Sequence, residues 1–330
     1  MPGGDDVARP KLQDVAARAG VSVTTVSRVL NNRGYLSDDL RRRVNAAIDE
    51  LGYRPDAIAR SLIGQKSGLV GIVVPTVADP FFGELVSAIE RSLAGHGYKA
   101  LLCDCQENAA REAEYLDLLQ ANRVDGIITS THNREVAGYD RAELPIVAVD
   151  RRLGAHIPVV RGDNRAGGRL ATEHLIARGA RAPILLTATD HPGNDRATSY
   201  REVMTAHGLE PRVRAYGYAT PVEDRRALVE TWLAETGADG VFATDDLTAM
   251  MALEWAHKTG RRVPEDVRVV GYDGSAAVRQ GVPGLTTIGQ PIERLGARAA
   301  QLLVDRIAAP DAETAPEPPL PVALRVGWTS

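Results

Sequence analysis

Apolar residues near the amino terminus recur at helical spacing in two short runs joined by a glycine. The apolar positions are Val15, Ala16 and Ala19 in the first run and Val26, Val29 and Leu30 in the second. Gly20 stands where a left-handed residue would end the first helix, and Ser22 can cap the second. The pattern therefore predicts a helical hairpin with a tight turn.

The polar face of the second predicted helix carries the chemistry of this segment. It presents Val23, Thr24, Ser27 and Arg28 opposite the apolar stripe. A short exposed face of these residue types can contact base edges in the major groove of DNA. Taken alone, the same pattern also fits an ordinary helical hairpin.

The next segments continue as helices and end in a linker. A third helix is predicted from Ser37, a candidate N-cap, to about Leu51. Pro55 opens a shorter helical pattern, which is too short to be stable alone in water. A helix of this kind, placed before the polar boundary at Gly64, is expected to fold when it binds.

From Leu69 the pattern changes to buried strands alternating with helices, in two successive sets. Strands are predicted at 68–75, 98–105, 124–130 and 145–150, and then at 182–188, 212–218, 240–246 and 267–273. Helices are expected near 82–95, 109–121, 165–178, 196–207, 222–235 and 247–259. This alternation predicts an α/β body of two doubly wound parallel-sheet lobes, with a cleft at the carboxyl ends of the strands. Residues 309–321 read as an exposed connector into a last strand at 321–328.

Composition narrows the class of protein. Residues 1–66 hold eleven Lys and Arg against eight Asp and Glu, a net +3, whereas the remainder carries −7. A basic head on an acidic body suits a protein whose head meets phosphates. No apolar run reaches the ~20 residues that span a bilayer. The start of the chain is not that of a secretory signal. We therefore expect no membrane partner and a cytoplasmic, nucleoid-associated protein.

The two cysteines, Cys103 and Cys105, lie two apart on a predicted strand. They share a face, which is poor geometry for a disulfide between them. Without further Cys or His at ligand spacing they do not predict a metal site either. We interpret them as buried, unreactive thiols and expect neither a metal nor a cofactor.

Several motifs in order resemble those of the lactose/galactose repressor (LacI/GalR) family. They are DVAARAGVSVTTVSRVLN, AAIDELGYRPDAIARSL, GIVVPTVADPFFGELVSAIE, DNRAGGRLATEHLIARG, VFATDDLTAM, VVGYDG and LTTIGQP. The resemblance covers nearly the whole chain. It implies a bacterial transcription regulator with a helix-turn-helix head, a hinge helix and a body of the type I periplasmic-binding-protein kind.

The resemblance also implies roles for individual residues of the head and hinge. It assigns DNA contacts or their support to Val23, Thr24, Ser27, Arg28, Asn31, Tyr53, Ala59 and Leu62. Leu62 matches the residue that the family wedges between base steps of the minor groove, and a charged residue there should abolish tight operator binding. The alternative for Leu62 is packing of one helix on another. Lys11 departs from the helix cap common in the family.

In the body, the resemblance implies a pocket for a small effector. The matching positions are Asp79, Phe81, Phe82, Asp150, Arg151, Arg196, Thr244, Asp273 and Gln290. Carboxylates that accept from hydroxyls, guanidinium groups that donate, and an aromatic floor favour a polyhydroxylated ligand. Thr244 replaces a frequent Asn, which leaves the identity of the sugar open, and for single Asp or Arg residues a surface salt bridge is the alternative.

The expected domains follow from these segments. They are a flexible tail at 1–9, a DNA-binding domain at 10–54, a hinge helix and linker at 55–68, and an effector-binding and dimerisation domain at 69–330. Within the last, the N-lobe should hold about 69–161 plus 291–321, and the C-lobe about 162–290 plus the last strand.

We expect a homodimeric repressor of carbohydrate genes that binds a near-palindromic double-stranded operator under control of a sugar. A purine or other non-sugar effector, and a stand-alone sugar-binding protein, are the alternatives, and the direction of the response stays open. No GxGxxG, GxxxxGK[ST] or HExxH motif is present, so an enzyme is not expected. No heptad-patterned helix follows the last strand, which favours a dimer over a tetramer.

Overall fold

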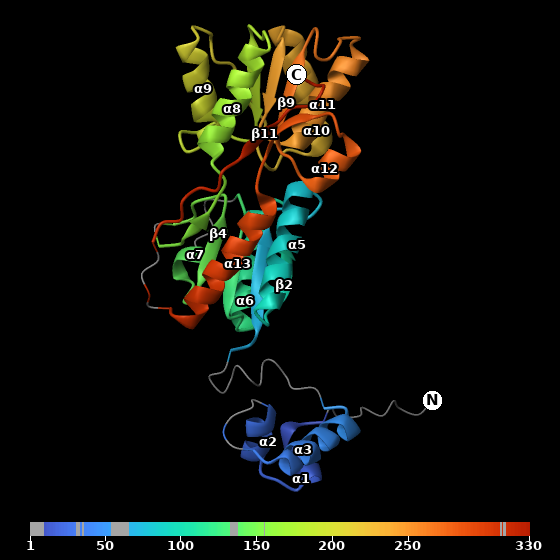
Figure 1. Ribbon diagram of the computed structural model, residues 1–330, viewed down its shortest axis with the longest axis vertical. Coiled ribbons are helices and arrows are strands. Elements are labelled where there is room, and N and C mark those ends of the chain that lie inside the picture. Colours follow the sequence, from blue (N-terminus) through green and yellow to red (C-terminus); the bar gives the residue numbers. More distant parts are fainter. Residues whose placement is uncertain are drawn as a thin grey trace, which may run out of the picture. The chain divides into compact units, whose positions relative to one another are not determined.

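The computed structural model describes residues 10–30, 34, 36–53, 66–132, 138–154, 156–310, 312 and 315–330. These residues divide into two compact units, 1–67 and 68–330. The expected tail at 1–9 and most of the expected hinge helix lie outside the described residues. Figure 1 shows the helical unit and the α/β unit.

The first unit is a small helical domain built around one core. Its helices are α1 (Leu12–Ala19), α2 (Val23–Leu30) and α3 (Asp38–Leu51). Gly20 ends α1 at φ 64°, and the Ser22 and Ser37 hydroxyls accept from the backbone N–H groups of Thr25 and Leu40. The core side chains of this unit include Val15, Ala19, Val26, Val29 and Val44. The hairpin and third helix predicted from the apolar spacing are confirmed.

Lys11 directly precedes α1, and its side chain forms no cap because an ammonium group cannot accept a hydrogen bond from the helix. Instead, the Asp14 carboxylate accepts from the Lys11 backbone N–H at 2.7 Å. Arg43 of α3 donates to the Ala19 carbonyl at 2.7 Å, which satisfies a carbonyl at the end of α1. These two hydrogen bonds offset the missing side-chain cap of α1.

The first lobe of the second unit is a parallel five-stranded sheet in the order β2-β1-β3-β4-β5. Its strands are β1 (Leu69–Val74), β2 (Lys99–Asp104), β3 (Gly126–Thr129), β4 (Ile146–Val149) and β5 (Val159–Val160). Its helices are α5 (Pro80–Gly95), α6 (Ala109–Ala121), α7 (Gly138–Arg141) and α13 (Ile292–Ala308). Alternate strand residues face opposite ways, so that Ile72 packs towards α5 and α13 whereas Val73 packs towards α6.

The second lobe is a six-stranded sheet in the order β11-β10-β9-β8-β6-β7. Its strands are β6 (Pro183–Thr187), β7 (Val213–Ala215), β8 (Gly240–Ala243), β9 (Arg268–Asp273), β10 (Thr286–Gly289) and β11 (Ala323–Arg325). Its helices are α8 (Asn164–Ala177), α9 (Asp195–Ala206), α10 (Val222–Thr236), α11 (Asp246–Lys258) and α12 (Ala276–Gly281). Figure 1 shows α8 and α9 lying together on one side of this sheet.

Several sequence-based expectations differ from the structure. The strand expected at 212–218 spans only 213–215, and the last strand is only Ala323–Arg325 and runs antiparallel to β10. This sheet is therefore mixed rather than wholly parallel. The sequence-based expectations also omit β5, β10, α7, α12 and α13. The first four are too short to show a period, whereas the 17 residues of α13 are long enough to show one.

The chain passes between the lobes three times, near residues 161–163, 290–291 and 320–322. After the second passage α13 packs against α5, β3 and β4 of the first lobe, and after the third β11 joins β10 of the second. Gly162 forms an isolated parallel bridge with Leu320, which holds two of the crossing segments side by side. The cleft between the lobes therefore adjoins these crossings.

Candidate functional site

The helical unit exposes a narrow polar face on α2. Val23 is 40% exposed, Thr24 and Arg28 are exposed, and Ser27 is half-buried. Val26 and Val29 anchor the opposite face in the core. The core thus positions on one exposed face the residue types that can contact base edges.

The surroundings of Arg28 and of the remaining residues expected to contact DNA differ from one residue to the next. The Arg28 guanidinium lies close to Gly34, where an added Cβ would approach Arg28 Nη2 to 2.6 Å. Tyr53 is half-buried and packs against the core of this unit. Asn31, Ala59 and Leu62 lie outside the described residues.

A cleft of about 870 Å³ lies between the lobes of the second unit. It is lined by residues that follow strand ends in both lobes, as expected for open α/β sheets. Of the nine expected effector residues, eight line it: Asp79, Phe81, Phe82, Asp150, Arg151, Arg196, Thr244 and Asp273. Gln290 differs from the expectation, since it lies behind Asp273 rather than on the cleft wall.

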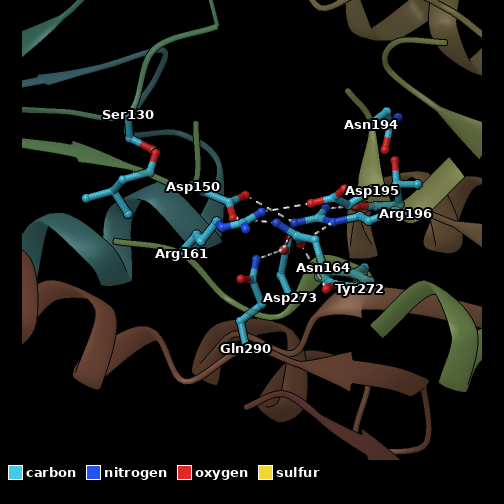
Figure 2. Close-up of polar contacts among 12 residues, drawn as sticks. Ser130, Asp150, Arg161, Asn164, Asn194, Asp195, Arg196, Tyr272, Asp273 and Gln290 are labelled. Carbon is cyan, nitrogen blue, oxygen red and sulfur yellow. Dashed lines mark hydrogen bonds and ion pairs between the residues drawn. The ribbon is translucent and has the colours of Figure 1, made fainter. Parts of the chain in front are cut away.

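Arg196, the second residue of α9, is the polar centre of the cleft (Figure 2). Its guanidinium donates to Asn164 Oδ1 at 2.8 Å and to the Thr244 carbonyl at 2.6 Å, and it pairs with Asp150 Oδ2 at 3.3 Å. It also stacks 3.7 Å from the centroid of the Tyr272 ring. Burial opposes its charge, but Tyr272 and the neighbouring carboxylates outweigh that effect and raise the pKa of Arg196. Arg196 therefore remains charged while joining the two lobes.

Asp150 and Asp273 occupy corresponding places in the two lobes. Asp150 follows β4 and Asp273 ends β9, which is the equivalent strand of the second sheet. Both adopt positive φ, 61° and 101°, a conformation that costs roughly 1–3 kcal/mol for such residues. Burial raises the pKa of Asp273 well above its usual range, although Arg196 at 4.0 Å opposes the shift. The fold thus places two aspartates with strained backbones next to the Arg196 guanidinium.

Two further carboxylates cap helices at the cleft. Asp79 caps α5 by accepting from the Phe81 N–H at 2.8 Å, and Asp245 caps α11 while accepting from the Tyr216 hydroxyl at 2.6 Å. Burial and the Asp245 charge raise the pKa of Asp79 to about 6. Because Asp79 and Asp245 belong to different lobes, the cleft brings like charges towards each other, with Arg225 compensating.

Aromatic rings form the apolar part of the cleft. Phe81 and Phe82 pack edge to face at 5.1 Å, and both belong to the core beneath α5 as well as to the cleft wall. The His132 ring of the first lobe lies 5.6 Å from the Phe82 ring, edge to face, and stacks on Tyr218 of the second lobe at 3.7 Å and 13°. Arg151 lies over the same Tyr218 ring at 5.1 Å and donates to the His132 carbonyl. The rings supply flat surfaces on which a sugar ring can stack.

Some contributors to the site were not assigned from sequence. They are His132, Asn164, Tyr216, Arg225, Asp245 and Tyr272. Asn164, Asp245 and Tyr272 lie within motifs already singled out for their resemblance. His132 follows a predicted strand, Tyr216 lies near the end of one, and Arg225 lies on a predicted helix. Their positions after strand ends were the available signal.

The arrangement suits binding of a polyhydroxylated ligand of little net charge. Its carboxylates can accept from hydroxyls and Arg151 and Arg196 can donate, while the guanidinium of Arg196 is already balanced by Asp150. Among the described residues there is no group of three or more His, Cys, Asp or Glu side chains suited to a metal ion. Within the same residues, no helix is long and apolar enough to cross a membrane.

Cys103 and Cys105 are buried free thiols, and neither of them lines the cleft. Burial raises their pKa values to about 11 and about 12, so the reactive thiolate is disfavoured. The interpretation of both as unreactive thiols is consistent with this environment.

A helix-turn-helix unit joined to a two-lobed ligand-binding body defines a class of regulatory proteins. Residues 11–56 match the model of bacterial regulatory proteins of the lacI family, and residues 172–330 match the periplasmic-binding-protein-like domain. The chain is 41% identical to the sucrose operon repressor of Pediococcus pentosaceus, over 98% of this chain and 100% of that protein. The chain belongs to the LacI family.

Two further proteins are also similar to this chain over nearly its whole length. The ribose operon repressor of Halalkalibacterium halodurans is 39% identical over 90% of each chain. The lac repressor dimer bound to operator and the anti-inducer ONPF has a TM-score of 0.83 and 26% identity, over 97% of this chain and 98% of that one. The fold expected from the sequence, a helical head with a two-lobed α/β body, is confirmed.

Proposed function

We propose that this protein represses carbohydrate-utilisation genes and that a sugar in the cleft controls its affinity for operator DNA. The observation that carries the proposal is the match to a sucrose operon repressor along 98% of the chain. That match includes the helical unit and the cleft together, which supports a protein that combines DNA binding with control by a ligand.

The chemistry of the cleft supports a neutral sugar as the effector. Asp150 and Asp273 can accept from adjacent hydroxyls, and Tyr218, Phe81 and Phe82 offer ring faces or edges. Binding across both lobes favours one lobe arrangement, and operator affinity changes only by the difference in sugar affinity between arrangements. We favour induction, in which the sugar lowers operator affinity.

On the DNA side, we propose that two copies of the chain bind a near-palindromic operator. A single α2 reads only a few base pairs, and a symmetric pair doubles the contact with DNA. Val23 and Thr24 would contact bases while Arg28 contacts a base edge or a phosphate. The place of action is the chromosome in the bacterial cytoplasm.

The effector is tested with an operator selected from a randomised duplex pool. Sucrose, ribose and guanine are titrated against the complex by fluorescence anisotropy, and their binding to the free protein is followed by thermal shift. We expect one sugar to weaken operator binding by roughly 5–150-fold. A response to guanine alone would overturn the sugar assignment, and tighter binding with sugar would reverse the direction.

The DNA-reading face is tested with the double variant V23A/T24A. We expect it to lose sequence preference while retaining its thermal stability, since both side chains are exposed. The control is Asn45→Ala on the exposed face of α3. Equal preference in the variant, the control and the unmodified chain would remove α2 from the DNA contact.

We further propose that the cleft binds its ligand without converting it. The sugar that shifts the operator complex should be recovered unchanged after prolonged incubation with the protein. Appearance of a cleavage or oxidation product in a chromatogram would contradict this.

A further inference from the structure

The three segments that pass between the lobes meet at Gly162. The Asp163 N–H donates to the Leu320 carbonyl and the Leu320 N–H to the Arg161 carbonyl, each at 2.8 Å. A Cβ added at Gly162 would lie 2.7 Å from Gln290 Oε1 and 3.4 Å from Val322 Cγ1. Gln290 belongs to the second passage and Val322 to the third. Because Gly162 has no side chain, the side chains of Gln290 and Val322 can pack close to the backbone of the first passage.

Gln290 connects this meeting point to the effector cleft. Its Nε2 donates to Asp273 Oδ1 at 2.8 Å, and its backbone N–H donates to the Asp273 carbonyl at 2.9 Å (Figure 2). The side chain is only 5% exposed, and its Oε1 is buried with no hydrogen-bond partner among the described residues. The amide is therefore held by Asp273 on one side, and on the other its oxygen fills the space beside Gly162 that a side chain would otherwise take.

Asp273 itself is not free to move independently of this contact. It stands at a strained φ of 101°, lines the cleft, and lies 4.0 Å from the Arg196 guanidinium. A ligand hydroxyl that displaces the Asp273 carboxylate must also displace the Gln290 amide or break its hydrogen bond. Because the amide oxygen lies in the space that a Cβ at residue 162 would take, a displaced amide changes the packing of the crossing segments.

We propose that Gln290 is a positioning residue that couples occupancy of the cleft at Asp273 to the crossing of the lobes at Gly162. The role of this coupling in the response to a sugar rests on the proposed function. The arrangement of Gln290 between Asp273 and Gly162 is tested without any ligand. Gln290 thereby acts through Asp273 and not as a contact of the effector.

Two variants perturb the contact from opposite ends in the full-length chain. Gln290→Met keeps a long side chain but cannot donate to Asp273. Gly162→Ala inserts a methyl group that forces the Gln290 amide away from its present position. Gly281→Ala is the matched control, since an added Cβ there meets nothing within 4 Å.

Hydrogen exchange of the ligand-free protein provides the first readout. In Q290M and G162A, the amides of residues 161–163, Leu320 and Val322 should exchange about fivefold faster, the equivalent of one lost hydrogen bond. Amides of β1 and β8 should be unchanged, and G281A should match the unmodified chain. Unchanged exchange at the crossings in both variants, or equal acceleration across the whole body, would overturn the proposal.

The second readout is the operator response to sucrose and ribose. Q290M should reduce the ratio of operator affinities with and without sugar at least about fivefold, by the same hydrogen-bond equivalence. Operator affinity without sugar should change less than that ratio. If neither sugar moves the operator complex of the unmodified chain, the sugar proposal fails while the exchange result still decides the role of Gln290.

Discussion

At the scale of single residues, the cleft is organised by charges that the fold has taken out of water. Arg196 connects Asp150 of the first lobe with Asn164 and Thr244 of the second. A buried ion pair of this kind adds little net stability, but removing one partner leaves the other charge uncompensated. The same groups that would bind a ligand therefore also determine how well the body tolerates substitution.

Replacing Arg196 by Met should destabilise the protein strongly. The substitution leaves the Asp150 carboxylate without its cation and the Thr244 carbonyl without a donor, at a cost of about 3–5 kcal/mol in the free energy of unfolding. Urea denaturation measures the change. Arg169→Met, an exposed position on α8, should stay within about 0.5 kcal/mol of the unmodified chain. Equal stability of R196M and R169M would contradict the role given to Arg196.

Asp246 gives the protein a pH-dependent stability of defined sign. It is 3% exposed, accepts from Thr287 Oγ1 at 2.6 Å and from the Gly274 N–H at 2.8 Å, and burial raises its pKa to about 7. Between about pH 4 and pH 7 the folded state therefore binds a proton that the unfolded chain has lost. Stability from this group rises as pH falls through that window, by up to ~1.4 kcal/mol per pH unit.

Asp246→Asn should reduce this pH dependence. The amide can accept from the Gly274 N–H and donate to the Thr287 hydroxyl, so the neutral contacts are retained. Unfolding in urea at about pH 5 and about pH 7.5 compares the slopes of the two proteins. The slope that remains in D246N comes from Asp79 and Asp273, whose pKa values are also raised, and with the opposite sign from His132 and His174, whose pKa values burial lowers. A slope as steep in D246N as in the unmodified chain would exclude Asp246 as its source.

At the scale of elements, close contact between helices fixes the first lobe. α13 packs along α5, and a Cβ added at Gly296 would lie 2.6 Å from Ala88 Cβ and 2.9 Å from the Ile89 nitrogen. α5 also contacts the second lobe, where Glu84 accepts from the Ala276 N–H of α12 at 2.6 Å. α5 thus connects the packing of α13 to the lobe interface.

Gly296→Ala should push α13 away from α5. Overpacking of this kind costs about 1–3 kcal/mol, which outweighs the gain in helix propensity. Gly95→Ala, at the end of α5 with nothing within 4 Å of the added Cβ, serves as the control and should be neutral or slightly stabilising. Thermal unfolding measures both variants. A stabilised G296A would show that the two helices separate without loss.

At the scale of the whole molecule, the net charge has opposite signs in the part of the chain that would bind DNA and in the part that would bind the sugar. Residues 1–66 carry a net +3 and the remainder −7. Binding to DNA releases counterions, whereas a neutral ligand in a cleft of internally paired charges releases few. Salt should therefore separate the two activities.

Operator affinity should fall by roughly 10³-fold or more between about 50 mM and 200 mM salt if the paired heads contact 6–10 phosphates. Sugar affinity over the same range should change less than about twofold, because screening acts on exposed charges. Anisotropy and calorimetry on the same preparation measure the two. An operator affinity independent of salt would contradict the assigned DNA contacts.

Much of the architecture was predictable because it is set by local side-chain spacing. The stripe of Val15, Ala19, Val26 and Val29 defined the hairpin, and strand runs such as 69–74 defined the sheets. The spacing of Ile292, Leu295, Ala299 and Leu303 also shows the helical period of α13. Short elements such as β5 and β7 show no period, so their bounds depend on neighbouring strands.

Side-chain spacing along the chain was enough to give the two kinds of unit and the residue types that follow the strands of the body. It did not give three contacts of the folded chain: Arg196 between Asp150 and Thr244, His132 stacked on Tyr218, and Gln290 hydrogen-bonded to Asp273 from behind. These contacts join residues far apart in the chain. They depend on how two separately patterned lobes pack across the crossings, and local periodicity holds no information about that packing.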